Sequence, residues 1–138
     1  MTLIKTIYKG NLRTEIEHHD SGARIITDAP LDNNGKGEAF SPTDLFASSL
    51  GACILTIAGM AAESHGFSID GATIETVKVM AANPRRIAEL CLDITFPRKY
   101  TEKEMRLIDA AIKTCPVANS LHPDIVKSIV LHFPEELS

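Results

Sequence analysis

The sequence lacks any excess of positive charge. Its 14 lysine and arginine residues are outnumbered by 18 aspartate and glutamate residues, and the net charge is -4. Nucleic acids and anionic membrane surfaces reward a basic protein surface. We therefore expect neither a nucleic acid nor a membrane as a partner.

The sequence also lacks the marks of export. The N-terminal segment MTLIKTIYKG has no apolar core of signal-peptide length and no cleavage-site pattern. We therefore expect a cytoplasmic protein. In that compartment the three cysteines are more readily explained as reduced thiols or a redox pair than as structural bridges.

Several motifs of metal and catalytic sites are missing. The five histidines show no zinc-site spacing and no H-E-x-x-H pattern. The segment NNGKGEAF lacks the phosphate-loop pattern, and ASSLG lacks the first glycine of a nucleophile elbow. No C-x-x-C motif joins any two cysteines. We expect no metal and no cofactor.

What is present is the composition of an ordinary globular protein. Of the 138 residues, 23% are charged and 44% hydrophobic, which argues against disorder. A chain of this length suits one domain. No repeat, low-complexity tract or linker divides it, so we expect a single domain over residues 1–138.

One uncharged run, residues 45–62, stands out. It is just long enough for a transmembrane helix. However, serine, threonine and glycine lower its hydrophobicity, and no second span or basic flank would set its orientation. A buried helix of a soluble core is the better interpretation. Its small residues suit close packing on several sides or against the same helix of a second subunit.

The ends of this helix are well marked. Ser41 is a good N-cap, Pro42 suits the first helical position, and Asp44 suits the third. We expect the helix to run to about His65 and to stop at Gly66, which can adopt the left-handed conformation of a cap.

Alternation and turn signals predict strands on either side of this helix, and Thr101 with Glu104 forms a capping box that begins a second helix. The second helix should end at about Thr114, because a proline follows Cys115. The order of elements indicates an α+β fold. The predicted strands cover residues 4–8, 13–19, 23–27, 73–81, 87–96 and 125–133, and a short helical turn covers 116–121.

Two cysteines are candidates for chemistry. Cys53 lies mid-helix on an apolar stripe, where a small hydrophobe filling the core is the simpler interpretation. Cys115 precedes Pro116 at a helix start, where free amides would stabilise a thiolate, although a cysteine tolerated in a turn explains it equally well. Cys91 lies on the polar face of a strand and is expected to be structural or incidental. The stripe of Cys53 comprises Phe46, Leu50, Ile57 and Met60.

Two segments together resemble the OsmC/Ohr family of thiol-dependent peroxidases. They are SPTDLFASSLGACILTIAGMAAE and TCPVANSLH, and the resemblance covers nearly the whole chain. It is closer to the OsmC-like branch than to the dedicated organic hydroperoxide reductases. The resemblance implies antiparallel sheets around a long central helix and an intertwined homodimer with its active site at the dimer interface.

The resemblance also implies a reaction. Cys53 would attack an organic hydroperoxide, or hydrogen peroxide, as a thiolate and become a sulfenic acid. Cys115 would then form a disulfide with it, which an external dithiol reduces. Arg13 best matches the arginine that stabilises the thiolate in active relatives, and Arg24 is the alternative.

One position departs from the family pattern. Family peroxidases typically carry a glutamate directly after the helix proline, whereas this chain has Thr43 there and Asp44 one residue later. Asp44 is a candidate partner for Arg13, although one residue turns a helix by about 100°. The departure leaves open two other functions: a non-enzymatic dimer that binds a small hydrophobic or thiol-reactive ligand, and a cysteine redox sensor.

Overall fold

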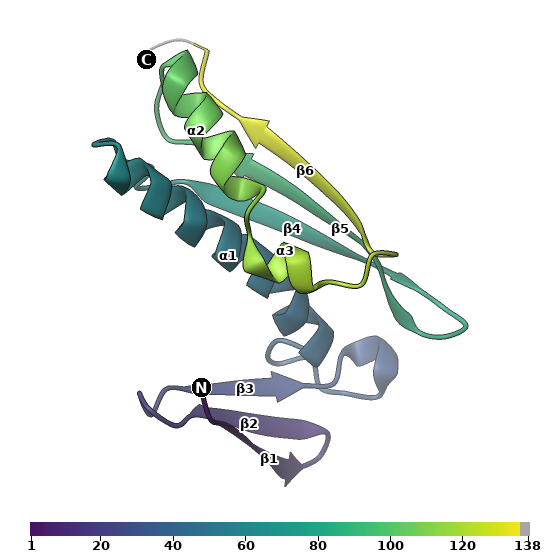
Figure 1. Ribbon diagram of the computed structural model, residues 1–138. Helices are drawn as coiled ribbons and strands as arrows, with labels where there is room; N and C mark the ends of the chain where they lie inside the picture. The colour runs from purple at the N-terminus through teal and green to yellow at the C-terminus, as the bar shows by residue number, and fades with distance from the viewer. Residues whose placement is uncertain (136–138) are drawn as a thin grey trace. The chain divides into compact units, whose positions relative to one another are not determined.

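The computed structural model describes residues 1–135 as two compact units, Met1–Phe46 and a larger unit that begins at Ala47. Figure 1 shows the elements of both. Each unit contains one three-stranded sheet, which agrees with the predicted α+β class.

The sheet of the first unit is an antiparallel meander in the order β1-β2-β3. Asn11 and Leu12 both have positive φ angles in the tight turn between β1 and β2. The three strands confirm the sequence prediction, but a 3-10 turn lies in the following loop, for which no regular structure was expected. The strands are β1 (Ile4–Gly10), β2 (Arg13–His18) and β3 (Arg24–Asp28), and the turn is η1 (Leu31–Asn33).

The two faces of this first sheet differ in character. One face carries ion pairs, such as Arg24 with Glu15 and with Glu17. Ile7 and Ile26 share this charged face, while the strand register places Ile4, Tyr8, Ile16 and Ile25 on the other one. These remain largely exposed in the single chain, at 58% for Ile4 and 65% for Tyr8. Apolar side chains exposed to this extent are typical of a sheet face that another layer covers.

Helix α1 (Pro42–Ser64) begins at the predicted cap. The amide of Asp44 donates to Ser41 Oγ at 3.1 Å, and the amide of Ser41 donates to the Asp44 carboxylate at 3.0 Å. This reciprocal arrangement satisfies two amides that would otherwise lack partners at the helix start.

The end of α1 also matches the prediction. Gly66 has a φ of 76°, and the amide of Phe67 donates to the carbonyl of Ala62 at 3.0 Å. This is the bonding pattern of a helix closed by a left-handed glycine.

The sheet of the second unit has the order β4-β5-β6. It is formed by β4 (Thr73–Ala81), β5 (Arg86–Thr95) and β6 (Val126–His132). The β4 and β5 strands pair antiparallel, as expected, but β5 and β6 pair parallel. The expectation of antiparallel sheets is therefore wrong for β6.

The parallel pairing has a clear cause. The chain leaves β5 and returns to β6 through two helices, α2 (Glu102–Ile112) and α3 (Pro116–Ser120). Such a crossover brings the next strand back in the same direction, whereas a hairpin reverses it. The predicted capping box at the start of α2 is confirmed, with Thr101 and Glu104 bonded in both directions.

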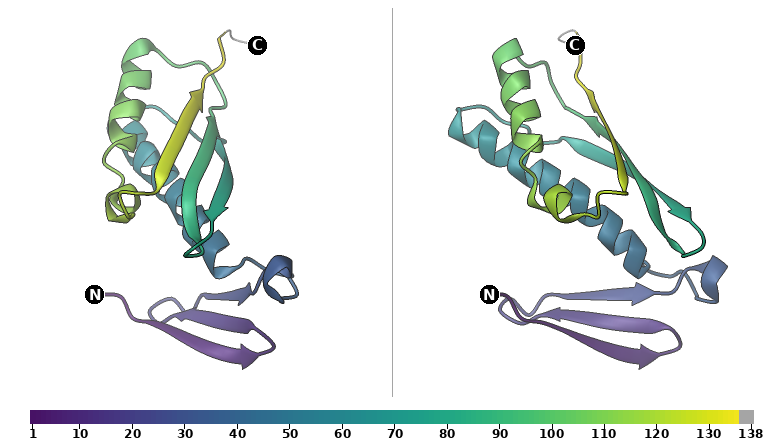
Figure 2. Two further views of the ribbon diagram at one scale, coloured as in Figure 1. Left: turned by 90° about the vertical axis from the view of Figure 1, so that its right-hand side faces the viewer. Right: turned by 45° about the vertical axis from the view of Figure 1, so that its right-hand side comes forward.

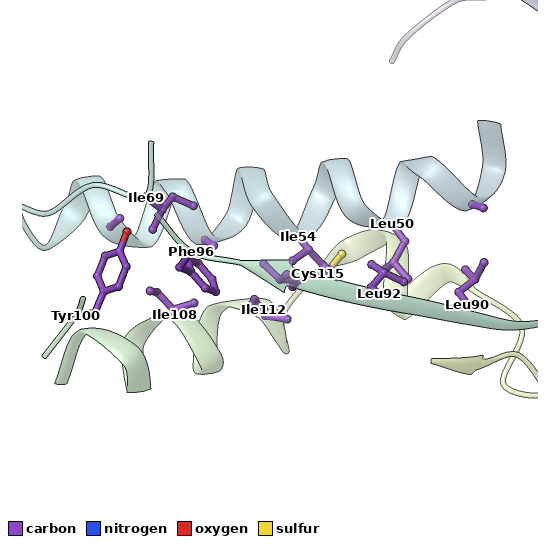
Figure 3. Packing of buried hydrophobic residues seen from close by; sticks show 14 of the residues in the cluster. Leu50, Ile54, Ile69, Leu90, Leu92, Phe96, Tyr100, Ile108, Ile112 and Cys115 are labelled. Atoms are coloured by element: carbon purple, nitrogen blue, oxygen red, sulfur yellow. The ribbon is translucent and has the colours of Figure 1, made fainter. Parts of the chain in front are cut away.

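The core of the second unit lies between its sheet and its helices. Both α1 and α2 cover the same face of the sheet (Figure 2). The predicted alternation on β5 is confirmed, since its inward side chains are at most 2% exposed. Figure 3 shows how they meet the helices. The residues are Leu90, Leu92, Ile94 and Phe96 from β5 and its end, Leu50 and Ile54 from α1, and Ile108 and Ile112 from α2.

Helix α1 is long and apolar enough to cross a membrane, with a mean hydropathy of 1.9 over an 18-residue window. Its inward face nevertheless packs into the protein core. Small side chains occupy that face, so the helix can approach the sheet closely. They are Ala47, Gly51, Ala58 and Ala62. We therefore interpret α1 as the core helix of a soluble domain.

Candidate active site

Cys53 lies halfway along α1 and is partly buried against the core. The predicted apolar stripe around it is not a single buried face. Leu50 is fully buried, but Phe46 is 45% exposed and Met60 is 58% exposed. The buried side chains of α1 lie on a different face of the helix, which includes Ala47 and Leu50. The predicted stripe therefore turns away from the sheet along the helix.

Cys115 is the N-cap residue of α3, and Pro116 takes the first helical position, as predicted. The side chain is fully buried, with no exposed surface. The backbone amides of Val117 and Ala118 lie near its sulfur and act to lower the pKa of the thiol, although no side-chain cap hydrogen bond is formed. The fold therefore holds this thiol in one place, pointing from α3 into the core toward α1 (Figure 3).

The structure brings Cys53 and Cys115 together. Their side chains lie close enough for Cys53 to influence the pKa of Cys115, and both cysteines are free rather than joined as a disulfide. Burial raises the pKa of Cys115, and the neighbouring Cys53 thiol raises it further, while the two amides act in the opposite direction. Burial thus favours the protonated form of Cys115 beside Cys53.

Cys91 lies elsewhere, on the face of β5 that points away from the helices. Its register neighbours are Val77 on β4 and Ser128 on β6. Partial burial raises the pKa of Cys91, and the carboxylate of Glu89 raises it further. No described residue beside it would favour its thiolate.

Arg13 belongs to the first unit, where it makes a two-pronged ion pair. Its Nε donates to Asp28 Oδ1 at 2.7 Å, and its Nη2 donates to Asp28 Oδ2 at 2.9 Å. Nη2 also lies 3.2 Å from Glu38 Oε2. Asp28 is only 2% exposed. These bonds lower the pKa of Asp28 and raise that of Arg13, so both groups stay charged.

Asp28 and Glu38 were missed by sequence reasoning. Arg13 and Asp28 are directly opposite each other in the β2–β3 register. Counting outward from the turn between these strands would have paired them, because an antiparallel hairpin fixes which residues face each other. Glu38 gives no such signal, because it lies in the loop before α1.

The suggested pairing of Asp44 with Arg13 is not what the structure shows. The carboxylates that bind Arg13 are Asp28 and Glu38, whereas Asp44 accepts the Ser41 amide at the start of α1. Helix capping thus uses the carboxylate that we had considered for Arg13. The alternative arginine, Arg24, is 61% exposed and pairs with the partly buried Glu15 and Glu17 on its own sheet.

No group of three metal-ligating side chains occurs within residues 1–135. In the second unit, the candidate site is the Cys53–Cys115 pair.

Comparison with known proteins assigns the family. The family described as OsmC-like protein matches residues 35–129, which is more than half of the chain. The chain therefore belongs to the OsmC-like protein family, as the two cysteine segments indicated. No curated protein matches it.

Solved structures agree with this assignment. One, from Psychrobacter arcticus 273-4, is provisionally named an osmotic stress induced and detoxification response protein. It is 50% identical, with 96% of each chain covered and a TM-score of 0.91. An organic hydroperoxide resistance protein OsmC from Legionella pneumophila is 18% identical, with 96% of each chain covered and a TM-score of 0.76. The organic hydroperoxide resistance protein OhrB of Bacillus subtilis is 19% identical, covers 95% of this chain and 97% of its own, and has a TM-score of 0.67. The last two show a shared fold.

Proposed function

We propose that this protein is a thiol-dependent peroxidase that reduces organic hydroperoxides, with hydrogen peroxide as a second substrate. The observation that supports this most directly is the contact between the Cys53 and Cys115 thiols in an OsmC-like domain. Two thiols held together in the reduced state need little motion to form a disulfide.

The reaction begins with the Cys53 thiolate. It attacks one oxygen of the peroxide, so that an S–O bond forms while the O–O bond breaks, and the alcohol leaves. Cys53 is then a sulfenic acid. The Cys115 sulfur displaces the sulfenic hydroxyl as water and forms a disulfide. An external dithiol reduces this disulfide by thiol exchange.

The different burial of the two thiols suits this division of roles. Cys53 is partly exposed, whereas Cys115 has no exposed surface. A peroxide can therefore reach Cys53 but not Cys115. Because the pKa of Cys115 is raised by burial, it stays a thiol until the sulfenic acid forms beside it.

Arg13 is proposed as the cation that stabilises the Cys53 thiolate, as the family resemblance implies. Its permanent charge and its fixed ion pair with Asp28 suit this role, because a positive group near a thiolate favours the charged form.

A homodimer is part of the proposal. Ile4 and Tyr8 on the first sheet, and Phe46 and Met60 on α1, are all more than two-fifths exposed in the single chain. Apolar surface on this scale is typical of a protein–protein interface. A second copy of the chain is the expected cover.

Thr43 favours one other function, a dimer that binds a small hydrophobic or thiol-reactive ligand without turnover. It stands where family peroxidases typically carry a glutamate. This function predicts a rise in melting temperature with ligand, by mass action, and no consumption of peroxide.

The test is stopped-flow consumption of cumene hydroperoxide and hydrogen peroxide by pre-reduced protein, with free thiols counted before and after. We expect loss of two thiols per chain in the wild type, no rapid reaction in Cys53→Ser, and normal reaction in the control Cys91→Ser. Equal rates for Cys53→Ser and wild type would refute the peroxidase and leave ligand binding as the better function.

A further inference from the structure

The sheet of the second unit has one face that its helices do not cover. Helices α1 and α2 lie on the opposite face (Figure 2), and we call the face that carries Cys91 the outer face. Strand register gives it four valines, two on each edge strand, which are 39% to 59% exposed in the single chain. A solvated sheet face usually carries polar side chains instead. The valines are Val77 and Val79 on β4, and Val126 and Val130 on β6.

The outer face also carries negative charge. Strand register places Glu75, Glu89 and Asp93 on it. Glu89 accepts a hydrogen bond from the Ser128 hydroxyl at 2.7 Å, and Asp93 Oδ1 lies 2.9 Å from His132 Nε2. The pKa of Cys91, which stands between Glu89 and Asp93 on β5, is raised by burial and by both carboxylates, as expected where the local potential is negative.

The basic side chains of the same strands are directed elsewhere. Lys78 and Lys127 are both in register with Leu90, whose side chain is buried on the inward face. Arg86, at the hairpin end of β5, donates to two carbonyls of the turn at 3.0 and 2.9 Å. Within the described strands β4, β5 and β6, no lysine or arginine therefore neutralises the outer face. The net charge of the whole chain is -4, so the three carboxylates account for most of that excess.

We propose that the outer face is a docking surface for a helical segment of a partner protein, in which lysine or arginine side chains form a stripe between apolar side chains. The layout of the face favours this occupant. Glu89 and Asp93 lie along the central strand β5, and the valines flank it on both sides. A basic stripe over β5 pairs with the carboxylates, while the apolar side chains beside it cover the valines. The proposed peroxidase reaction uses none of these residues.

The dimensions agree with a single helix. Neighbouring strands are about 4.8 Å apart, which separates β4 from β6 by about 10 Å. A helix with its side chains is about 10–12 Å across, so it reaches the valines of both edge strands. Glu89 and Asp93 are four positions apart on β5, or about 13 Å along a strand. Two helical turns rise about 11 Å, so bases two turns apart face both carboxylates.

Other occupants fit this face less well. An anionic membrane surface is repelled by its carboxylates. A strand of another protein adds to the edge of a sheet, where backbone groups lack partners, and leaves the face open. Covering the apolar face of a sheet is the ordinary role of a helix.

The test uses the whole protein and a synthetic helical peptide. The peptide carries arginines about two turns apart, leucines on both sides of that stripe and glutamine elsewhere; the control peptide has glutamate in place of arginine. Fluorescence anisotropy measures the affinity. We expect the arginine peptide to bind, more weakly as salt is added, and the glutamate peptide not to bind. Failure of the arginine peptide to bind at low salt would overturn the proposal.

A matched pair of charge variants locates the binding site. Glu75→Gln/Asp93→Asn should weaken binding by about fivefold to thirtyfold, because two ion pairs are lost. Glu102→Gln/Asp109→Asn removes the same charge from α2, which covers the other face of the sheet, and should leave the affinity nearly unchanged. Equal losses in the two variants would show that the peptide responds only to net charge.

Apolar contacts are tested separately. Val77→Ser/Val126→Ser should weaken binding by about tenfold, because apolar surface is no longer buried; an unchanged affinity would contradict the proposal. If this variant alone altered the sedimentation coefficient of the peptide-free protein, the occupant would be a second copy of the chain. Methyl spectra of the wild type need no variant to fold: shifts on adding the peptide should centre on the four valines, and shifts centred elsewhere would overturn the proposal. Both charge variants should consume peroxide as the wild type does, so failure of the docking surface leaves the peroxidase test unaffected.

Discussion

Cys53, halfway along α1, lies close enough to Cys115, the N-cap residue of α3, to raise the pKa of the Cys115 thiol. Two segments far apart in the chain thus bring one cysteine each into proximity. One thiol is partly exposed and the other is fully buried. This asymmetry assigns separate roles to the two residues and leads to the first prediction.

Cys115→Ser should stop the reaction halfway. Cys53 would still attack the peroxide, but no thiol would remain beside it to form the disulfide. We expect one thiol lost per chain and a stable sulfenic acid on Cys53, detected by mass spectrometry after reaction with dimedone. Unlabelled Cys53, with two thiols still lost per chain, would show that Cys115 is not the resolving residue.

The reduced protein should lose stability at alkaline pH through Cys115. Burial raises its pKa in the folded state, so the folded protein holds the proton more tightly than the unfolded chain does. The resulting stabilisation is present below the unfolded thiol pKa of about 8.5 and is lost as the pH rises through the folded value. We expect the melting temperature of the reduced protein to fall more between pH 8 and pH 10 (about the range of thiol titration) than that of the oxidised protein. Cys91 is the same in both forms, so its contribution cancels.

Asp28 should contribute to stability at the acid end. Its folded pKa is lowered, chiefly by the hydrogen bonds from Arg13. The stabilisation is therefore present above the unfolded aspartate pKa of about 3.9 and is lost as the pH falls through the folded value. We expect the melting temperature of Asp28→Asn to fall less with decreasing pH than that of the wild type. The melting temperature of Glu15→Gln should follow the wild type. Parallel curves for all three proteins would contradict this.

Two glycines should respond in opposite directions to alanine. In α1, a Cβ at Gly51 would lie 3.5 Å from Ile74 Cγ2 and 3.6 Å from Thr76 Oγ1, which is ordinary contact. Gly51→Ala should therefore stabilise by about 0.5–1 kcal/mol, because alanine is the better helix former. At Gly35 a Cβ would overlap the carbonyl of Ala29, so the alanine variant should be destabilised. Urea unfolding at one fixed protein concentration measures both, and a stabilised Gly35→Ala would show that this loop relaxes freely.

A charge on the exposed side of α1 should separate the proposed dimer. Met60 is 58% exposed in the single chain, and Val126 on β6 is 55% exposed. Lysine at either position adds one charge to a similarly exposed apolar site. We expect Met60→Lys to be monomeric in sedimentation velocity and Val126→Lys to remain dimeric. A dimeric Met60→Lys protein would place the interface away from this part of α1.

The local features of this protein were determined by the sequence itself. The cap formed by Ser41 and Asp44, the capping box of Thr101 and Glu104, and the alternation from Leu90 to Phe96 all appear where the sequence predicts them. Each depends on residues a few positions apart. The backbone amides at a helix start find their hydrogen-bond partners within that short range, and the side chains of a strand alternate within it.

Features that join distant segments were decided by the tertiary structure. The sequence did not reveal that Asp28 holds Arg13, because that depends on strand register, or that β6 runs parallel to β5, because that depends on the crossover through α2 and α3. It named Cys53 and Cys115 but could not place one thiol against the other. Contacts of this kind form only when whole elements pack on one another. They cannot be predicted from the spacing of residues along the chain.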